Sequence, residues 1–147
     1  AFDDILSAIQ DGVPGARIHG VTVQPMATPG IEVIIGAAKD PGFGPFLMFG
    51  LGGLLVEVLR DVAFRLVPLS PRDASQMVRE VRGYPILEGV RGGPPANIGA
   101  LEETLLRLSD LIETHPNIQE LDLNPVLVYP EGLLAADARI VLEDRKQ

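Results

Sequence analysis

Short apolar runs separated by glycine and proline constrain the fold of this chain more than any other feature of its sequence. The 147 residues include 16 Gly and 13 Pro, which cluster at turns between the runs. The runs are rich in β-branched residues and have the length of strands. They lie at residues 20–26, 31–38, 46–51, 54–59, 63–69, 120–128 and 133–142. The pattern predicts a series of short strands, of which the last two form a hairpin around residues 129–132.

Three helices are expected beside these strands. The first begins near Phe2 and ends before Gly12, with apolar residues at helical spacing. Residues 70–73 (SPRD) start the second, because they supply an N-cap, a Pro at the first helical position and an acid three residues on. The third has an apolar face over residues 97–114, and residues 84–96 are predicted as a loop by their Gly and Pro content. Strands and helices in one domain give the class α+β.

Charge and composition exclude several kinds of function. The formal net charge is −8 and basic residues form no run, so a nucleic acid is not an expected partner. The absence of Cys excludes disulfides, a thiolate nucleophile and a cysteine zinc site, and it fits a reducing, cytoplasmic environment. No apolar run is long enough to span a membrane, and the first residues lack the basic start of a signal peptide. The abrupt helical start without Met predicts a fragment of a longer polypeptide.

The C-terminal hairpin carries the strongest prediction of a site. Asp122 and Asn124 lie two residues apart in a strand and therefore share a face. A turn centred near Glu131 places Asn124 nearly opposite Asp137. Two carboxylates and one amide oxygen would then converge, a set of hard oxygen ligands that suits Mg²⁺. The alternative is that these three residues form the solvated face of an edge hairpin.

Three further candidates each have a structural alternative. The backbone N–H groups of residues 50–53 (GLGG) could contact phosphate, or these glycines could simply form a turn. Arg65, with Glu57 nearby in sequence, is a candidate phosphate contact and catalytic group, but an intramolecular ion pair explains it equally. Glu32 stands in an apolar strand, either to accept from hydroxyls such as those of a ribose or simply to face water.

Several strings together resemble one family, in the order in which that family has them. They are GVTVQPM, GIEVIIGAAKDPGFGPFLMFGLGG, VEVLRDVAFRLVPL, GYPILEGVRG, ELDLNPVLVYPEG and AADAR. The chain is similar, over about residues 15–142, to the ATP-grasp region of ADP-forming acyl-CoA synthetases, the branch related to the β subunit of succinyl-CoA synthetase. The resemblance implies a mixed β-sheet flanked by helices, as in the second lobe of an ATP-grasp fold.

The activity that the resemblance implies is that of an acid–thiol ligase. ATP, a small-molecule carboxylic acid and CoA give acyl-CoA, ADP and phosphate, with ATP and Mg²⁺ as cofactors. The partners implied are the CoA-binding and ligase domains of the same polypeptide or of a partner subunit, with no nucleic acid and no membrane.

The resemblance also assigns residues. Asn124 and Asp137 match the family's metal ligands, and Asp122 stands where many members have Glu. Gln24, Pro25 and Met26 match the strand along the adenine edge. Glu32 occupies the usual ribose-contacting position. Arg65 matches the pattern as well, with a less defined role.

The departure from the family concerns its first lobe, whose phosphate-contacting lysines and Gly-rich phosphate cover have no counterpart in residues 1–147. The chain is therefore expected to be a partial ATP-grasp domain, the second lobe without the first, and inactive by itself. Two alternatives remain at this point: a regulatory or assembly lobe of a multidomain acyltransferase-type protein, and an acidic interaction module without a ligand.

Overall fold

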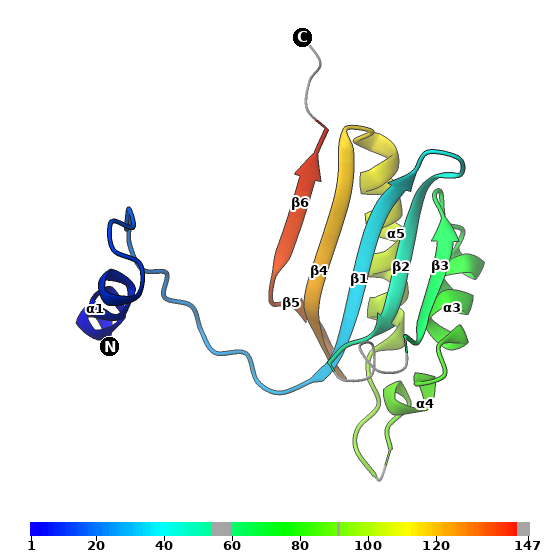
Figure 1. Cartoon of the computed structure of the whole chain (residues 1–147). Helices are drawn as coiled ribbons and strands as arrows, with labels where there is room; N and C mark the ends of the chain where they lie inside the picture. The colour runs from blue at the N-terminus through cyan, green and yellow to red at the C-terminus, as the bar shows by residue number, and fades with distance from the viewer. Residues whose placement is uncertain (54–59, 91, 144–147) are drawn as a thin grey trace.

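A six-stranded sheet with helices packed on one face forms the body of the protein (Figure 1). The computed structural model describes residues 1–53, 60–90 and 92–143. The strands are β1 (Ile31–Asp40), β2 (Gly44–Leu51), β3 (Val62–Leu66), β4 (Ile118–Tyr129), β5 (Gly132–Ala135) and β6 (Ala138–Leu142). Their order is β3-β2-β1-β4-β5, and β6 also pairs with β4. The predicted α+β class with a helix-flanked sheet is confirmed.

All strand pairs of the described residues are antiparallel, where a mixed sheet was expected. Short connections join β1 to β2 and β4 to β5, and such connections can link only antiparallel neighbours. The long connection that carries the helices returns the chain to β1 through β4, which also runs antiparallel to it.

The hydrophobic core lies between the sheet and its helices. These are α3 (Pro71–Glu80), the short α4 (Tyr84–Leu87) and α5 (Ile98–Thr114). Leu101 and Leu105 of α5 and Met77 of α3 are fully buried against Val33 and Phe49 of the sheet. Alternate strand residues therefore enter the core, and the residues between them lie on the opposite sheet face. We call that face, which no described helix covers, the open face.

The N-terminal segment departs from the sequence prediction. Helix α1 (Phe2–Gly12) forms as expected and buries none of its residues. Residues 20–26 were predicted to be a strand, but they form neither strand nor helix and run as an extended connection from α1 to β1 (Figure 1). A strand needs a neighbour for its backbone hydrogen bonds, and no described strand lies beside this segment.

Two further differences are local. The predicted loop at 84–96 contains one helical turn, α4, and the second arm of the hairpin is divided into β5 and β6 at residues 136–137. The predicted run at 54–59 lies outside the described residues. Among the described helices, none combines the length and the apolar character needed to cross a bilayer.

The start of α3 yields a test of the predicted capping box. The Asp73 backbone N–H donates to Ser70 Oγ at 3.2 Å, and the Ser70 N–H donates to Asp73 Oδ2 at 2.9 Å. We expect Ser70→Ala to lower the free energy of unfolding by about 1 kcal/mol. Ser7→Ala, on exposed α1, is the control and should leave stability unchanged, as measured by chemical denaturation. Equal losses in both variants would contradict the role of the cap.

The same cap predicts a pH dependence. Hydrogen bonds from the Ser70 side chain and backbone lower the pKa of Asp73 from its ordinary value of 3.8. A lowered carboxyl pKa stabilises the fold fully above that ordinary value, and the contribution is lost as the pH falls through the pKa of the folded state. The stability difference between the wild type and Ser70→Ala should therefore shrink in acid.

Candidate functional site

The predicted oxygen ligands share the open face of the hairpin. Residues 123 and 138 are directly paired, and the Asn124 backbone N–H donates to the Asp137 carbonyl oxygen at 3.3 Å. Asn124 is thus opposite Asp137, as the sequence predicted. Asp122 lies two residues from Asn124 along β4, and all three side chains are exposed, whereas Leu121 between the strand's polar residues is buried in the core.

The backbone holds Asp137 at the break between β5 and β6. Next to the hydrogen bond between Asn124 and Asp137, the carbonyl oxygen of Pro125 accepts from the Ala136 N–H at 2.9 Å. The carboxylate of Asp137 accepts from the next backbone N–H, that of Ala138, at 2.9 Å. The side chain is therefore fixed beside β4 although its own residue belongs to neither strand.

The donor set at this position fits a hard divalent cation. It combines two carboxylates with one amide oxygen, the ligand types that Mg²⁺ prefers. Among the described residues, Asp122 and Asp137 form no ion pair, so their charges are not already neutralised by a basic side chain. Within the same described residues, no three His, Cys, Asp or Glu side chains form a metal-binding group. The set reaches three ligands only through Asn124.

Glu32 lies on the same face, one strand away. It is exposed and pairs across the sheet with Leu127, three residues from Asn124 along β4. The end of β2 packs tightly against it, because the Gly52 N–H donates to the Glu32 carbonyl oxygen at 2.7 Å. A Cβ on Gly52 would lie 3.0 Å from Glu32 Cβ, and Gly53 has a φ of +62°. Close packing against Glu32 requires glycine at position 52, and the positive φ favours glycine at position 53.

Gln24, Pro25 and Met26 lie in the extended connection that precedes β1. All three are exposed, and Met26 is 95% exposed. The adenine contacts that the resemblance implies for them stay a prediction, since the segment has no neighbour among the described strands.

Arg65 forms the intramolecular ion pair that the sequence left open. Its guanidinium pairs with Glu80 of α3, and it donates to the Phe64 carbonyl oxygen at 2.8 Å. It shares the face of buried Ala63 on the helix side of β3, away from Asp122. Its catalytic role remains a prediction, and Glu57 lies outside the described residues.

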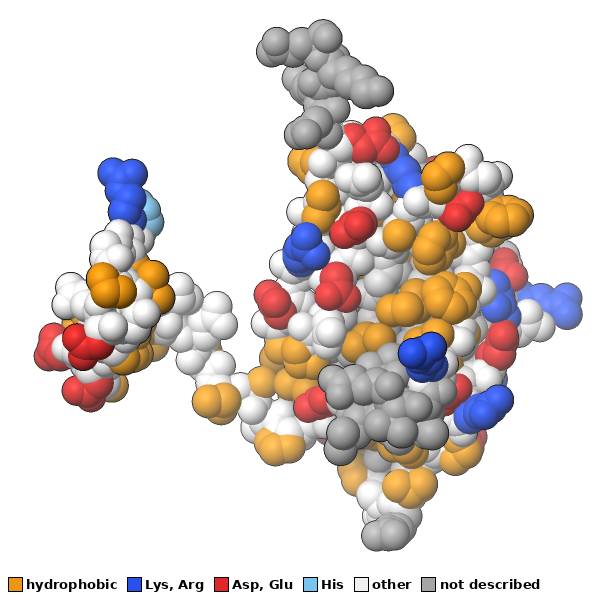
Figure 2. All heavy atoms as spheres, viewed as in Figure 1, with side chains coloured by type: hydrophobic (Ala, Val, Ile, Leu, Met, Phe, Trp, Pro, Cys, Tyr) orange, Lys and Arg blue, Asp and Glu red, His pale blue; other side chains and the backbone are white. Residues whose placement is uncertain are grey.

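One residue of this face escaped the sequence reasoning. Arg139 of β6 is directly opposite Asp122 of β4. Together with Gly36, Met48 and Phe64, the two charged residues line a groove of about 420 Å³ on the open face. The hairpin register that paired Asn124 with Asp137 also pairs Asp122 with Arg139, so the signal was present in the sequence. Figure 2 shows this face, with charged side chains over β4 and β6 and hydrophobic ones over β1 to β3.

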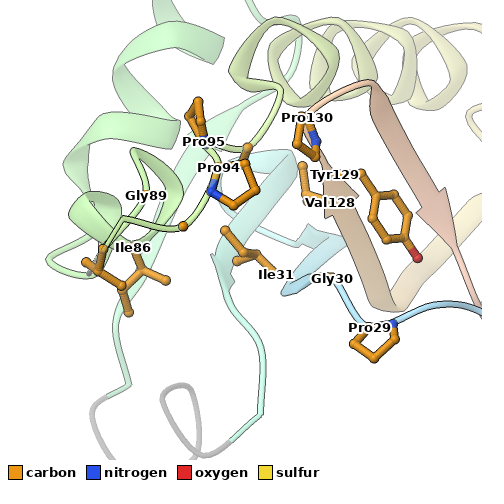
Figure 3. Close-up of a pocket in the computed structure, with 13 residues that line it drawn as sticks. Pro29, Gly30, Ile31, Ile86, Gly89, Pro94, Pro95, Val128, Tyr129 and Pro130 are labelled. Atoms are coloured by element: carbon orange, nitrogen blue, oxygen red, sulfur yellow. The ribbon is translucent and has the colours of Figure 1, made fainter.

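A second cavity lies elsewhere and has a different character. Its volume is about 350 Å³, and it lies between the start of β1, the end of β4 and the connection after α4 (Figure 3). Ile31, Ile86, Val128 and several prolines line it, and none of the lining residues that the structure describes carries a carboxylate or a basic group. It is therefore not the site of the predicted metal chemistry.

Known proteins are similar to this chain in sequence. The ATP-grasp domain family matches residues 1–142. The acetate–CoA ligase (ADP-forming) I of Archaeoglobus fulgidus is 51% identical over 142 residues, which are 97% of this chain and 21% of that protein. The β subunit of acetate–CoA ligase (ADP-forming) II of Pyrococcus furiosus is 50% identical over 133 residues, or 88% of this chain and 56% of that subunit.

A solved structure shares the fold. The dinucleotide-forming acetyl-coenzyme A synthetase 1 of Ca. Korarchaeum cryptofilum, in complex with coenzyme A and Mg-AMPPCP, matches with a TM-score of 0.77 and 50% identity. The match covers 80% of this chain and 55% of that chain. The chain thus spans 21%, 56% and 55% of the lengths of these three proteins. The ATP-grasp fold implied by the sequence resemblance is confirmed.

The packing around Glu32 yields a test. We expect Gly52→Ala to lower the free energy of unfolding by about 1–3 kcal/mol, because the new methyl group would meet the Glu32 backbone. Gly132→Ala is the matched control, since a Cβ there meets nothing within 4 Å. Chemical denaturation of both variants measures the difference. An unchanged stability of Gly52→Ala would show that this contact is not a constraint.

Proposed function

The chain belongs to the ATP-grasp domain family, and from this premise we propose that it is the nucleotide- and Mg²⁺-binding lobe of an ADP-forming acyl-CoA synthetase. The observation that carries the proposal is the convergence of Asp122, Asn124 and Asp137 on the open face, beside Glu32. In this proposal residues 1–147 are the second lobe of the domain. The whole protein converts ATP, a carboxylic acid and CoA to acyl-CoA, ADP and phosphate.

The metal would be held by Asn124 and Asp137, with Asp122 assisting directly or through water. When bound, Mg²⁺ neutralises charge on the phosphate groups during phosphoryl transfer. The chain contributes by holding the metal ligands in position. The hydrogen bonds across the hairpin at residues 124–125 and 136–137 support this role, because they set the spacing of Asn124 and Asp137 independently of any ligand.

The adenosine part of the nucleotide would lie toward Glu32. Its carboxylate is exposed on the same face as the metal ligands and forms no hydrogen bond among the described side chains, so it is available to accept from two ribose hydroxyls. Gln24, Pro25 and Met26 of the extended segment would lie along the edge of the adenine ring of a bound nucleotide.

Partners of the lobe are proposed to be the CoA-binding and ligase domains, in the same polypeptide or in a partner subunit. The relatives occur in both arrangements, since one is a long single protein and the other a β subunit. Exposed apolar surface supports this. The apolar side of α1 is exposed to solvent at Phe2 and Ile5. On β3, Phe64 and Leu66 are 51% and 55% exposed. A cytoplasmic location follows from the proposed reaction, and the isolated lobe is expected to be inactive.

Removal of the Asp137 carboxylate tests the proposed metal site. In the full-length protein that contains this chain, Asp137→Ala should abolish ADP formation and Mg²⁺-dependent ATP binding, because one of the two best-placed ligands is lost. Asp110→Ala, at an exposed carboxylate of α5, is the matched control and should keep both. Thermal unfolding of each variant confirms that the fold is intact. Turnover in Asp137→Ala would refute the metal role, and an inactive wild type that binds no ATP would favour a regulatory lobe.

A second test addresses Glu32 and the ribose. We expect Glu32→Ala to weaken Mg-ATP binding about 10-fold or more, because hydrogen bonds to a charged group are lost. Binding of 2′,3′-dideoxy-ATP, which lacks both hydroxyls, should be the same in the variant and the wild type. Isothermal titration of the four combinations measures the coupling. An equal loss for both nucleotides would assign Glu32 a general structural role.

A further inference from the structure

We propose that Arg139 contacts the terminal phosphate of the bound nucleotide, an assignment that rests on the proposed function and adds a residue to it. Arg139 lies on β6, directly opposite Asp122, with its side chain on the open face. It shares the groove there with Asp122 and Glu120. None of the described ion pairs or side-chain hydrogen bonds involves its guanidinium.

The position of Arg139 distinguishes it from the other basic strand residues. Lys39 of β1 pairs with Glu143 at 2.6 Å, and Arg65 of β3 pairs with Glu80; both lie on the helix side of the sheet. Among the basic residues that the described strands contain, Arg139 is therefore the one on the open face. A free guanidinium offers a planar fork of donors that matches phosphate oxygens.

The order of residues along the sheet supports a contact at the phosphate end. Glu32 pairs with Leu127, and Gly36 pairs with Asp122, so these two positions of β1 lie four residues, or about 13 Å, apart. Asn124 falls between them on β4. Going along the face, the proposed ribose contact comes first, Asn124 and Asp137 next, and Asp122 with Arg139 opposite it last. That is the order of ribose, bridged phosphates and terminal phosphate in a nucleotide triphosphate.

The surroundings leave room for a phosphate group at this point. The groove of about 420 Å³ beside Asp122 provides this room; the small residues Gly36 and Ala38 line it together with Met48, whose methyl carbon lies 3.3 Å from where a Cβ on Gly36 would be. The nearby carboxylates of Glu120, Asp122 and Asp137 would repel an anion by themselves. A metal on Asn124 and Asp137 together with Arg139 supplies the opposite charge, and the guanidinium would reach the phosphate from the side away from β1.

A series of ligands that differ only in their phosphates tests the contact. In the full-length protein with Mg²⁺, Arg139→Gln should bind adenosine and ADP within about 2-fold of the wild type. Binding of the non-hydrolysable analogue AMP-PCP should be about 10-fold or more weaker. Arg139→Lys keeps the charge without the planar fork of donors, so its affinity for AMP-PCP should lie between those of the wild type and Arg139→Gln. Arg107→Gln, at an exposed position of α5, is the matched control and should bind all ligands like the wild type.

The outcomes separate this proposal from the one it rests on. A wild type that binds none of the ligands overturns the proposed function itself. If the wild type binds AMP-PCP and Arg139→Gln binds it equally well, Arg139 does not contact the phosphate. A uniform loss across adenosine, ADP and AMP-PCP assigns Arg139 a structural role and also overturns the proposal. Mn²⁺ binding without nucleotide adds a check, because removal of a phosphate contact should not weaken it, whereas loss of a residue that organises the carboxylates should.

Discussion

An extra residue in β4 is the constraint on which the rest of the open face depends. Val33 of β1 pairs with Val126, but Ile35 pairs with Leu123, so residues 124 and 125 together oppose one residue of β1. Leu123 and Val126 differ by an odd number of residues, yet both enter the helix-side core. Only a bulge allows this, because side chains alternate strictly along an uninterrupted strand. Asn124 lies at the point where the alternation changes.

The partner arm of the hairpin accommodates the bulge by a break of its own. Residues 136 and 137 belong to neither β5 nor β6, yet both keep a backbone hydrogen bond to the bulged pair. Irregular backbone of this kind re-aims side chains next to functional sites. Apolar residues on both sides of the bulge therefore pack into the core, and Asn124 and Asp137 lie next to each other on the open face.

The sequence predicted those parts of the fold that depend on local chemistry. The cap at Ser70 follows from hydrogen bonds within four residues, and the pairing of Asn124 with Asp137 follows from a short hairpin turn. Features set by distant partners were missed. Residues 20–26 have strand composition but no neighbouring strand, and Arg65 was ambiguous until α3 supplied Glu80. The roles of the metal and nucleotide ligands depend on molecules that a sequence pattern alone does not contain.

The charges of the open face indicate how much positive charge the proposed nucleotide site would need. Glu32, Asp122 and Asp137 place three carboxylates on one face of a chain whose formal net charge is −8. A nucleotide triphosphate is itself an anion, so its approach to three carboxylates is unfavourable unless cations lie between them. Arg139 adds only one positive charge to this face. In the proposed function a divalent ion would supply most of the remainder, and further positive groups would be needed to stabilise the phosphate during transfer. The face is therefore suited to the proposed metal and nucleotide, and its carboxylates would make binding of the nucleotide conditional on that metal.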